Sequence, residues 1–210
     1  RTNADCLDRF WSLSRSGRLA HTDTTNPLVL DTAIWSEDTL ASTPTDARDM
    51  DIFENDSRVD SGKNQLFVTR DTDIAVLNDT GNNVWNQNWW VTTKAQVALR
   101  SGVPHPICYF PFRRIALVGD GTISRTSDTV NESVTAKRLI LPMNLEVQKI
   151  FYTTNRTWIL CRDLFERDGK AVEWDGSAET YNDIHSVYSP LPLSGVNYLE
   201  TPIILNNKGV

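Results

Sequence analysis

The sequence predicts an all-β protein built from repeated antiparallel hairpins, and three observations support this prediction. Short apolar segments are each followed by a polar turn, and this unit returns along the whole chain. The residue mix favours Thr, Val, Ile, Asn and Asp, which suit strands and turns rather than long helices. The unit also returns at a regular interval, which is typical of repeat architectures.

The interval between the units indicates the size of the repeat. Aligned at their apolar strands, the copies begin at Trp11, Leu66, Ile115, Trp158 and Ile203, with spacings of 55, 49, 43 and 45 residues. One four-stranded propeller blade takes about 40–50 residues. A single hairpin cannot bury its own apolar face, whereas blades that stack side by side cover one another.

We therefore predict a β-propeller of four-stranded antiparallel blades. Residues 1–210 are expected to form a single domain of about four to five blades, either a whole ring or a fragment of a larger propeller. The structural alternative is a β-sandwich, whose strands carry no superperiod of about 45 residues.

The copy around Ile115 shows the predicted blade best. Its four strands are expected at Ile107–Phe112, Arg114–Val118, Thr122–Arg125 and Lys137–Leu141. Gly119-Asp120-Gly121 joins the middle two, because glycine tolerates the positive φ of a tight hairpin. The second strand is continuously apolar, which predicts that neighbouring blades cover both of its faces.

Two polar stretches, residues 37–49 and 179–192, are interpreted as surface loops. Long insertions between blade strands emerge at a rim or an end of a propeller, where partners usually bind. Residues 94–100 suit either one helical turn or a strand.

Composition excludes several classes of function. The net charge is −6 with a pI of about 5.1, and no cluster of Lys and Arg predicts a nucleic-acid groove. No stretch approaches the ~20 apolar residues of a membrane span. Cys6, Cys108 and Cys161 form no CxxC pair, so we expect reduced and mostly buried thiols rather than a zinc site.

Two motifs are similar to elements of sialidase propellers. Residues 79–85 resemble the Asp-box, a structural turn that ends in a Trp packed between blades. Residues 112–115, Phe-Arg-Arg-Ile, are similar to a motif whose Arg grips a substrate carboxylate, but an extra Arg intervenes and Ala116 replaces Pro. Solvated arginines at a strand end are the alternative interpretation.

Trp85, Trp89 and Trp90, interleaved with Asn and Gln, form the most conspicuous aromatic cluster. If exposed, they would stack on sugars or anchor a protein partner, and if buried, they would pack between blades. Together with Arg113 and Arg114 they are the predicted candidates for partner or glycan contacts.

The remaining polar residues predict no catalytic, cofactor or metal site. Glu173 and Asp175 share one strand face by alternation, and paired carboxylates can perform acid–base chemistry or bind Ca²⁺. An ordinary Asp-Gly turn accounts for them as well. Asp71 and Asp73 are likewise interpreted as a turn.

The three histidines, His21, His105 and His185, are not spaced as metal ligands. Pro104-His105-Pro106 indicates a rigid turn.

Several segments resemble virion β-propeller proteins of tailed bacteriophages. The residues that carry the resemblance are 89–93, 98–106, 115–121, 139–142 and 173–176, within a stretch from Leu66 to Val210. The resemblance implies a non-enzymatic part of a phage particle, such as a tail, nozzle, hub or adhesion component. It transfers no catalytic residue.

The expected location is therefore the virion, in the tail or associated with it. Other virion proteins in a symmetric homo-oligomer are the expected partners, with a host glycan or receptor as a further candidate. The two predicted loops and residues 85–90 are the predicted contact surfaces. The alternative function is a sialidase-like propeller that binds glycans or hydrolyses glycosides, and a weaker one is a cellular peptide-binding scaffold.

Overall fold

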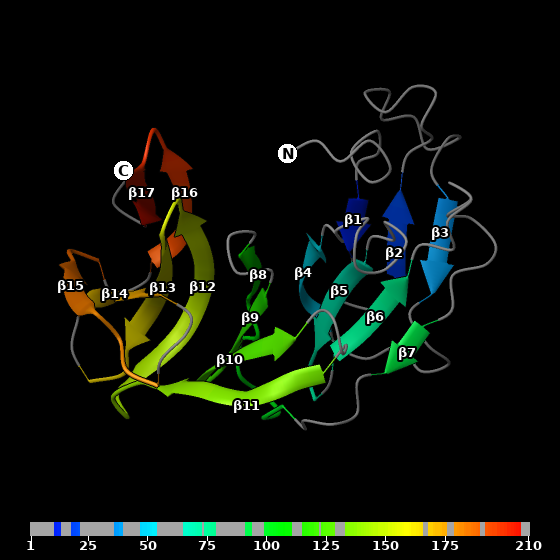
Figure 1. Ribbon diagram of the computed structural model, residues 1–210, viewed down its shortest axis with the longest axis horizontal. Coiled ribbons are helices and arrows are strands. Elements are labelled where there is room, and N and C mark those ends of the chain that lie inside the picture. The colour runs from blue at the N-terminus through cyan, green and yellow to red at the C-terminus, as the bar shows by residue number, and fades with distance from the viewer. Residues whose placement is uncertain are drawn as a thin grey trace.

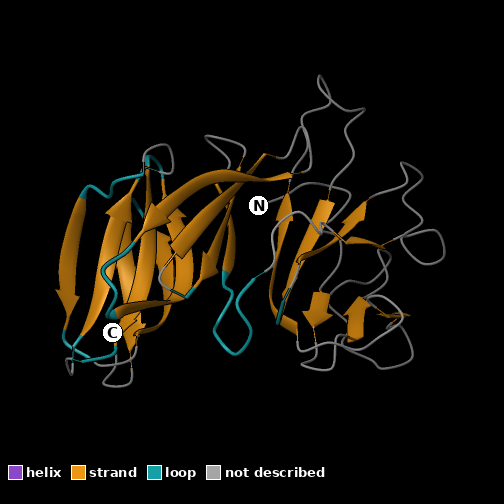
Figure 2. Ribbon diagram, turned by 90° about the horizontal axis from the view of Figure 1, so that it is seen from below, coloured by secondary structure: helices purple, strands orange, loops and turns teal. Residues whose placement is uncertain are grey.

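The structure, a computed structural model, describes about three fifths of the chain. The described residues are 11–13, 18–21, 36–39, 47–53, 65–72, 74–78, 91–93, 99–110, 115–121, 123–128, 133–165, 168–175, 179–189 and 192–206. Figure 2 shows strands and connecting loops in this part of the chain. Among these residues there is no apolar helix of the length needed to cross a bilayer.

The described strands form antiparallel sheets in which spatial order follows chain order. The first sheet contains β1 (Trp11–Leu13), β2 (Arg18–His21) and β3 (Ser36–Thr39). The second contains β4 (Ala47–Phe53), β5 (Gln65–Arg70), β6 (Ile74–Asn78) and β7 (Val91–Thr93). The third contains β8 (Ile107–Phe110), β9 (Ile115–Asp120), β10 (Ile123–Asp128) and β11 (Ser133–Ile140).

The fourth sheet contains β12 (Leu145–Thr153), β13 (Arg156–Asp163), β14 (Gly169–Trp174) and β15 (Asp183–Val187). The fifth contains β16 (Pro192–Tyr198) and β17 (Thr201–Asn206). In Figure 1 the second, third and fourth sheets follow one another from right to left, and β16 and β17 lie above the fourth sheet. Their first strands are neighbours, since β4 lies beside β8, β8 beside β12, and β12 beside β16.

The structure confirms the all-β prediction and the position of the repeat. Leu66, Ile115, Trp158 and Ile203 lie in β5, β9, β13 and β17, each the second strand of its sheet. The predicted turn at Gly121 is present, with a φ of 65° and a pairing of Asp120 with Ile123 across it. The first copy differs, because Trp11 begins the described part of its sheet.

The core explains why the second strands are continuously apolar. In β9, Val118 packs towards the second sheet, against Phe67 and Ile74, while Leu117 packs towards the fourth sheet. In β13, Ile159 and Cys161 face the third sheet. Leu160 instead joins Phe151, Ala171 and Val187 on the opposite face. Because side chains alternate along a strand, a middle strand that is covered on both faces carries apolar residues at every position.

The fourth and fifth sheets approach each other most closely at a glycine. Gly195 in β16 lies against the ring of Phe151 in β12, and a Cβ at this position would overlap three ring atoms. Glycine therefore permits β16 to lie directly on the fourth sheet, where Ile204 of β17 also packs.

Both predicted loops were wrong in part, because each contains strand residues. Residues 37–49 contain most of β3 and the start of β4, and residues 179–192 contain β15. These strands were missed because they are polar and their backbone pairing needs no apolar side chain. In β15, for example, Asp183, His185 and Ser186 are exposed. The ambiguous stretch at 94–100 lies outside the described residues except for its last two.

Candidate functional site

The candidate site lies where the first strands of three successive sheets approach one another. β8 is the edge strand of the third sheet, so its outward N–H groups have no strand to pair with. Asp49 and Asp51 of β4 supply the acceptors. Asp49 Oδ2 accepts a hydrogen bond from Ile107 N at 3.2 Å, and Asp51 Oδ2 accepts one from Tyr109 N at 2.7 Å. The spacing of the two carboxylates matches that of the two N–H groups, because alternate residues of a strand point to the same side.

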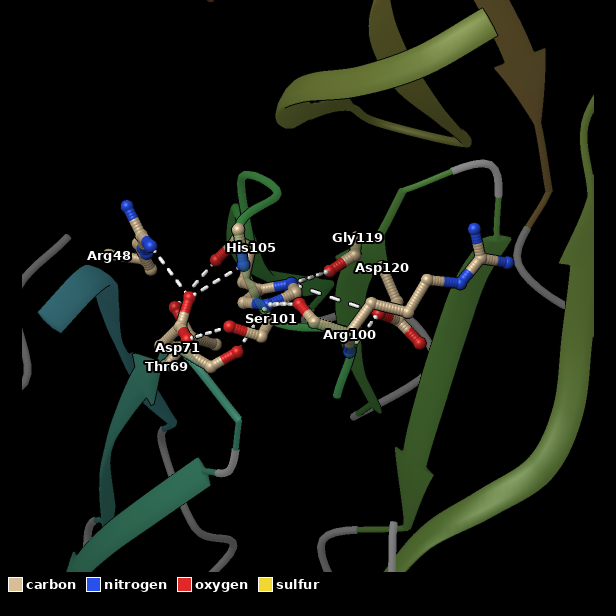
Figure 3. A network of polar contacts seen from close by, with 9 residues as sticks. Arg48, Thr69, Asp71, Arg100, Ser101, His105, Gly119 and Asp120 are labelled. Atoms are coloured by element: carbon tan, nitrogen blue, oxygen red, sulfur yellow. Dashed lines mark hydrogen bonds and ion pairs between the residues drawn. The ribbon is translucent and has the colours of Figure 1, made fainter. Parts of the chain in front are cut away.

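Asp71, in the turn between β5 and β6, binds the segment that precedes β8 (Figure 3). Its carboxylate accepts hydrogen bonds from Gly102 N at 2.9 Å and from the Ser101 hydroxyl. It also forms an ion pair with Arg48 at 2.7 Å. These contacts hold the pKa of Asp71 well below its ordinary value of 3.8, with the Gly102 hydrogen bond as the largest cause, followed by those from Ser101 and Arg48.

His105 lies at the centre of the same polar network and is 1% exposed. Its Nδ1 lies 3.1 Å from Gly119 O, and its Nε2 lies 3.0 Å from Asp71 O and 2.9 Å from Arg100 O (Figure 3). Carbonyl oxygens only accept, so each ring nitrogen makes a hydrogen bond here only while it carries a proton.

The carboxylate of Asp120 reinforces the network from the third sheet. It lies 4.0 Å from His105 Nδ1 and accepts a hydrogen bond from Arg100 N at 2.8 Å. Thr69 Oγ1 donates to His105 O at 2.5 Å from the second sheet. His105 therefore connects two sheets through backbone groups that are distant in sequence.

A pocket of about 410 Å³ opens beside this network. Its walls come from β4, the segment before β8, and β12, and include Arg48, Asp49, Pro104, Pro106, Gln148 and Lys149. Lys149 Nζ lies 2.7 Å from Asp49 Oδ2, so an ion pair joins the second sheet to the fourth across the pocket wall.

A second polar cluster lies on the fourth sheet. Arg156 Nε pairs with Glu173 Oε1 at 2.7 Å. His185 Nε2 lies 3.7 Å from Glu173 Oε2 and 3.8 Å from Asp183 Oδ2. The imidazole also contacts the indole of Trp158, with ring centroids 5.5 Å apart and planes inclined by 42°. The cluster thus combines a half-buried aromatic surface with carboxylates and a guanidinium group.

All five predicted contact residues lie outside the described part of the chain. Trp85, Trp89, Trp90, Arg113 and Arg114 therefore stay predictions. Of the paired carboxylates, Glu173 joins the second cluster and Asp175 is half-buried at the strand end.

Of the three cysteines, Cys108 and Cys161 are buried thiols outside any disulfide, as expected, and Cys6 lies outside the described residues. Burial raises the pKa of the Cys161 thiol. The described residues contain no group of three or more His, Cys, Asp and Glu side chains able to hold a metal ion.

Sequence reasoning missed the roles of Asp71 and His105, which were interpreted only as turn residues. Their partners are mainly backbone groups, which leave no sequence pattern. The one available signal was Asp49-Met50-Asp51, an alternation that places two carboxylates on the same side of a strand.

The described residues form an all-β array of antiparallel sheets packed face to face. A solved structure with a similar fold is a β-propeller protein. It is described as "Dihydro-heme d1 dehydrogenase NirN in complex with DHE", with a TM-score of 0.54 and 12% sequence identity. The match covers 85% of this chain, which spans 37% of the length of the NirN chain. At this identity the likeness concerns the fold alone.

A second similar structure is described as "Crystal structure of Nidogen/Laminin Complex". Its TM-score is 0.42 at 10% identity, covering 95% of this chain and 86% of that chain. No protein-family model matches the chain, and no curated protein matches it either.

Proposed function

We propose that this chain is part of a β-propeller and acts as a non-enzymatic structural and interaction component of a bacteriophage particle, associated with the tail. The four-stranded sheets are interpreted as blades, whose first strands lie nearest the ring axis. The neighbouring positions of β4, β8, β12 and β16 support this interpretation, as does the likeness to a propeller protein. The sequence resemblance supports the phage setting.

The observation that carries the interaction role is an exposed apolar surface at one end of the fourth sheet. Met143, Phe165 and Tyr188 are 87%, 85% and 80% exposed. Met143 precedes β12, Phe165 follows β13 and Tyr188 follows β15, and the antiparallel register brings all three to the same end. Large apolar side chains gathered on a surface mark protein–protein contact sites.

The connections that present these side chains are held by backbone hydrogen bonds. Leu164 N donates to Asn144 O at 2.7 Å, which ties the Met143 turn to the Phe165 turn. Gly169 N donates to Ser189 O at 2.5 Å, beside Tyr188. A surface that is fixed before binding loses little conformational entropy on assembly, which suits a structural subunit.

The location is tested by separating the source culture on a density gradient and identifying the chain by mass spectrometry. We expect its peptides in the particle fraction, together with other virion proteins. Their absence from particles, combined with glycosidase turnover by the purified chain, would contradict the proposal.

The surface is tested by a triple substitution, Met143→Ser, Phe165→Ser and Tyr188→Ser. We expect the variant to fold but to lose incorporation into particles, because the proposed contact is removed. The matched control is Leu199→Ser, since Leu199 is 81% exposed but lies at the opposite end, where Glu200 accepts from Thr154 N. Equal incorporation of both variants would refute the assigned surface.

The second cluster favours a glycan-binding function as the alternative. Trp158 offers a surface for stacking, and Glu173 and Arg156 offer hydrogen-bond partners for hydroxyl groups. Screening the purified chain on a glycan array, with Glu173→Gln as the paired variant, tests this function. Binding that disappears in the variant would support it.

A further inference from the structure

Two β-bulges, one in the second sheet and one in the fourth, contribute to the wall of the pocket. The register of β4 against β5 shifts between Ala47 and Asp49, and that of β12 against β13 shifts between Val147 and Lys149. Consecutive residues of a regular strand point to opposite faces of its sheet, whereas the extra residue of a bulge re-aims a side chain. The pocket is lined by two consecutive residues at each bulge, Arg48 with Asp49 and Gln148 with Lys149. Both bulges thus direct pairs of polar side chains to the same cavity.

The charges of this wall are balanced. Arg48 Nη2 forms an ion pair with Asp71 Oδ1 at 2.7 Å, and Lys149 Nζ forms one with Asp49 Oδ2, also at 2.7 Å. A ligand with a net charge would have to compete with one of these pairs or be enclosed without a counter-ion, and both cost free energy. The wall therefore favours a neutral ligand.

The same side chains offer hydrogen-bond donors and acceptors close together. An ammonium group carries three donors, and the ion pair of Lys149 with Asp49 uses one of them. Gln148 Nε2 donates to Glu146 Oε1 at 2.8 Å, which fixes the amide whose oxygen is an acceptor. The side chains of Lys149 and Asp49 are 33% and 23% exposed, so solvent reaches both. A hydroxyl group suits such a wall, because it donates to one partner and accepts from the other.

The segment before β8 supplies an apolar part of the wall. Pro104 and Pro106 line the pocket together with Val103. His105, between the two prolines, is 1% exposed and its ring is bound to carbonyl oxygens, which holds the segment in place. Proline rings offer C–H surface without N–H donors. A volume of about 410 Å³ lies within the range of small-molecule sites.

We propose that this pocket binds a neutral sugar. A pyranose ring carries hydroxyl groups around its rim and C–H groups on its faces. The rim bonds to the side chains at the two bulges, while one face lies on the rings of Pro104 and Pro106. The site goes beyond the virion role proposed above, and none of the residues that line it belongs to the cluster around Glu173.

The test uses glucose, galactose and mannose as probes, each also as its methyl glycoside. They are titrated into the purified chain with detection by ¹H–¹⁵N NMR. We expect at least one of these sugars to bind and to shift the resonances of Gln148 and Lys149. Binding of the methyl glycoside assigns the site to the terminal unit of a glycan, whereas binding of the free sugar alone assigns it to a free sugar. If none of the probes binds, the proposal is overturned.

Charged counterparts of the bound sugar test the balance of charge in the wall. The uronate of the same ring carries a negative charge, and the amino sugar carries a positive one. We expect each to bind about fivefold more weakly than the neutral sugar, because the cations and carboxylates of the wall are already paired. Tighter binding of either charged counterpart would contradict a site for neutral ligands.

Two substitutions at the β12 bulge locate the binding site. Gln148→Leu and Lys149→Met each remove a hydrogen-bonding group and are expected to weaken binding about five- to tenfold. The control is Lys170→Met, which loses a contact with Ser186 Oγ at 3.3 Å on β14, outside the pocket wall, and should leave the affinity unchanged. Thermal unfolding confirms that each variant is folded before titration. Unchanged affinity in both pocket variants would refute the site.

Discussion

At the scale of single residues, the structure uses buried polar side chains as connectors between sheets. His105 contacts three carbonyl oxygens, and Asp71 accepts from two residues of the segment that contains His105. A buried polar group that loses its partner costs more than an average hydrogen bond contributes. The stability of the contact between the second and third sheets should therefore depend strongly on these two positions.

We expect His105→Ala to lower the free energy of unfolding by about 2–4 kcal/mol, because it leaves a cavity and removes partners from buried carbonyl groups. Urea denaturation at neutral pH measures the loss. His185→Ala is the control, since the side chain of His185 is 46% exposed and should contribute less than about 1 kcal/mol. Equal losses in the two variants would contradict the structural role of His105.

Asp71 should make the free energy of unfolding depend on pH in the acid range. Its pKa is lowered in the folded state, so its contribution is fully present above the ordinary value of 3.8 and is lost as the pH falls below it. We expect Asp71→Asn to be less stable than the parent chain near pH 6, with the difference shrinking as the pH falls below 3.8. Denaturation curves of both proteins across this pH range measure the difference in stability. A difference that stays constant with pH would contradict the role assigned to the Asp71 carboxylate.

At the scale of elements, what the sequence predicts depends on which faces of a strand are buried. The second strands β5, β9, β13 and β17 were predicted correctly because their apolar runs and following turns are local signals. Strands β3, β4 and β15 were missed because they carry polar residues, and their stability comes from neighbours. The site was missed for a related reason, since carbonyl groups that meet His105 belong to segments that only the fold brings together.

The contact of β16 with β12 predicts a strict requirement for glycine. Gly195→Ala places a methyl group into the ring of Phe151, and we expect it to lower the free energy of unfolding by about 1–3 kcal/mol through overpacking. Denaturant unfolding provides the measurement. Val196→Ala, at a neighbouring position that is 58% exposed, should cost clearly less. A neutral Gly195→Ala variant would show that the two sheets are not in direct contact.

At the scale of the whole molecule, the third and fourth sheets are held from both sides by apolar clusters among the described residues. Separate apolar clusters join the second sheet to the third, the third to the fourth, and the fourth to the fifth. Each sheet thus depends on its neighbours, as in repeat proteins stabilised by nearest-neighbour interfaces. The repeat spacing predicted this succession from sequence alone, whereas the polar contacts between sheets were not visible in it.

The paired carboxylates on β4 have a consequence for how the protein behaves at high concentration. An unprotected strand edge is a template on which strands of other molecules can add. Asp49 and Asp51 occupy two N–H groups of β8 and place negative charge along that edge. The double variant Asp49→Ala and Asp51→Ala should therefore form oligomers and fibrillar aggregates that the parent chain does not form, as light scattering and thioflavin fluorescence would detect. Two acidic side chains would then serve as a safeguard against polymerisation.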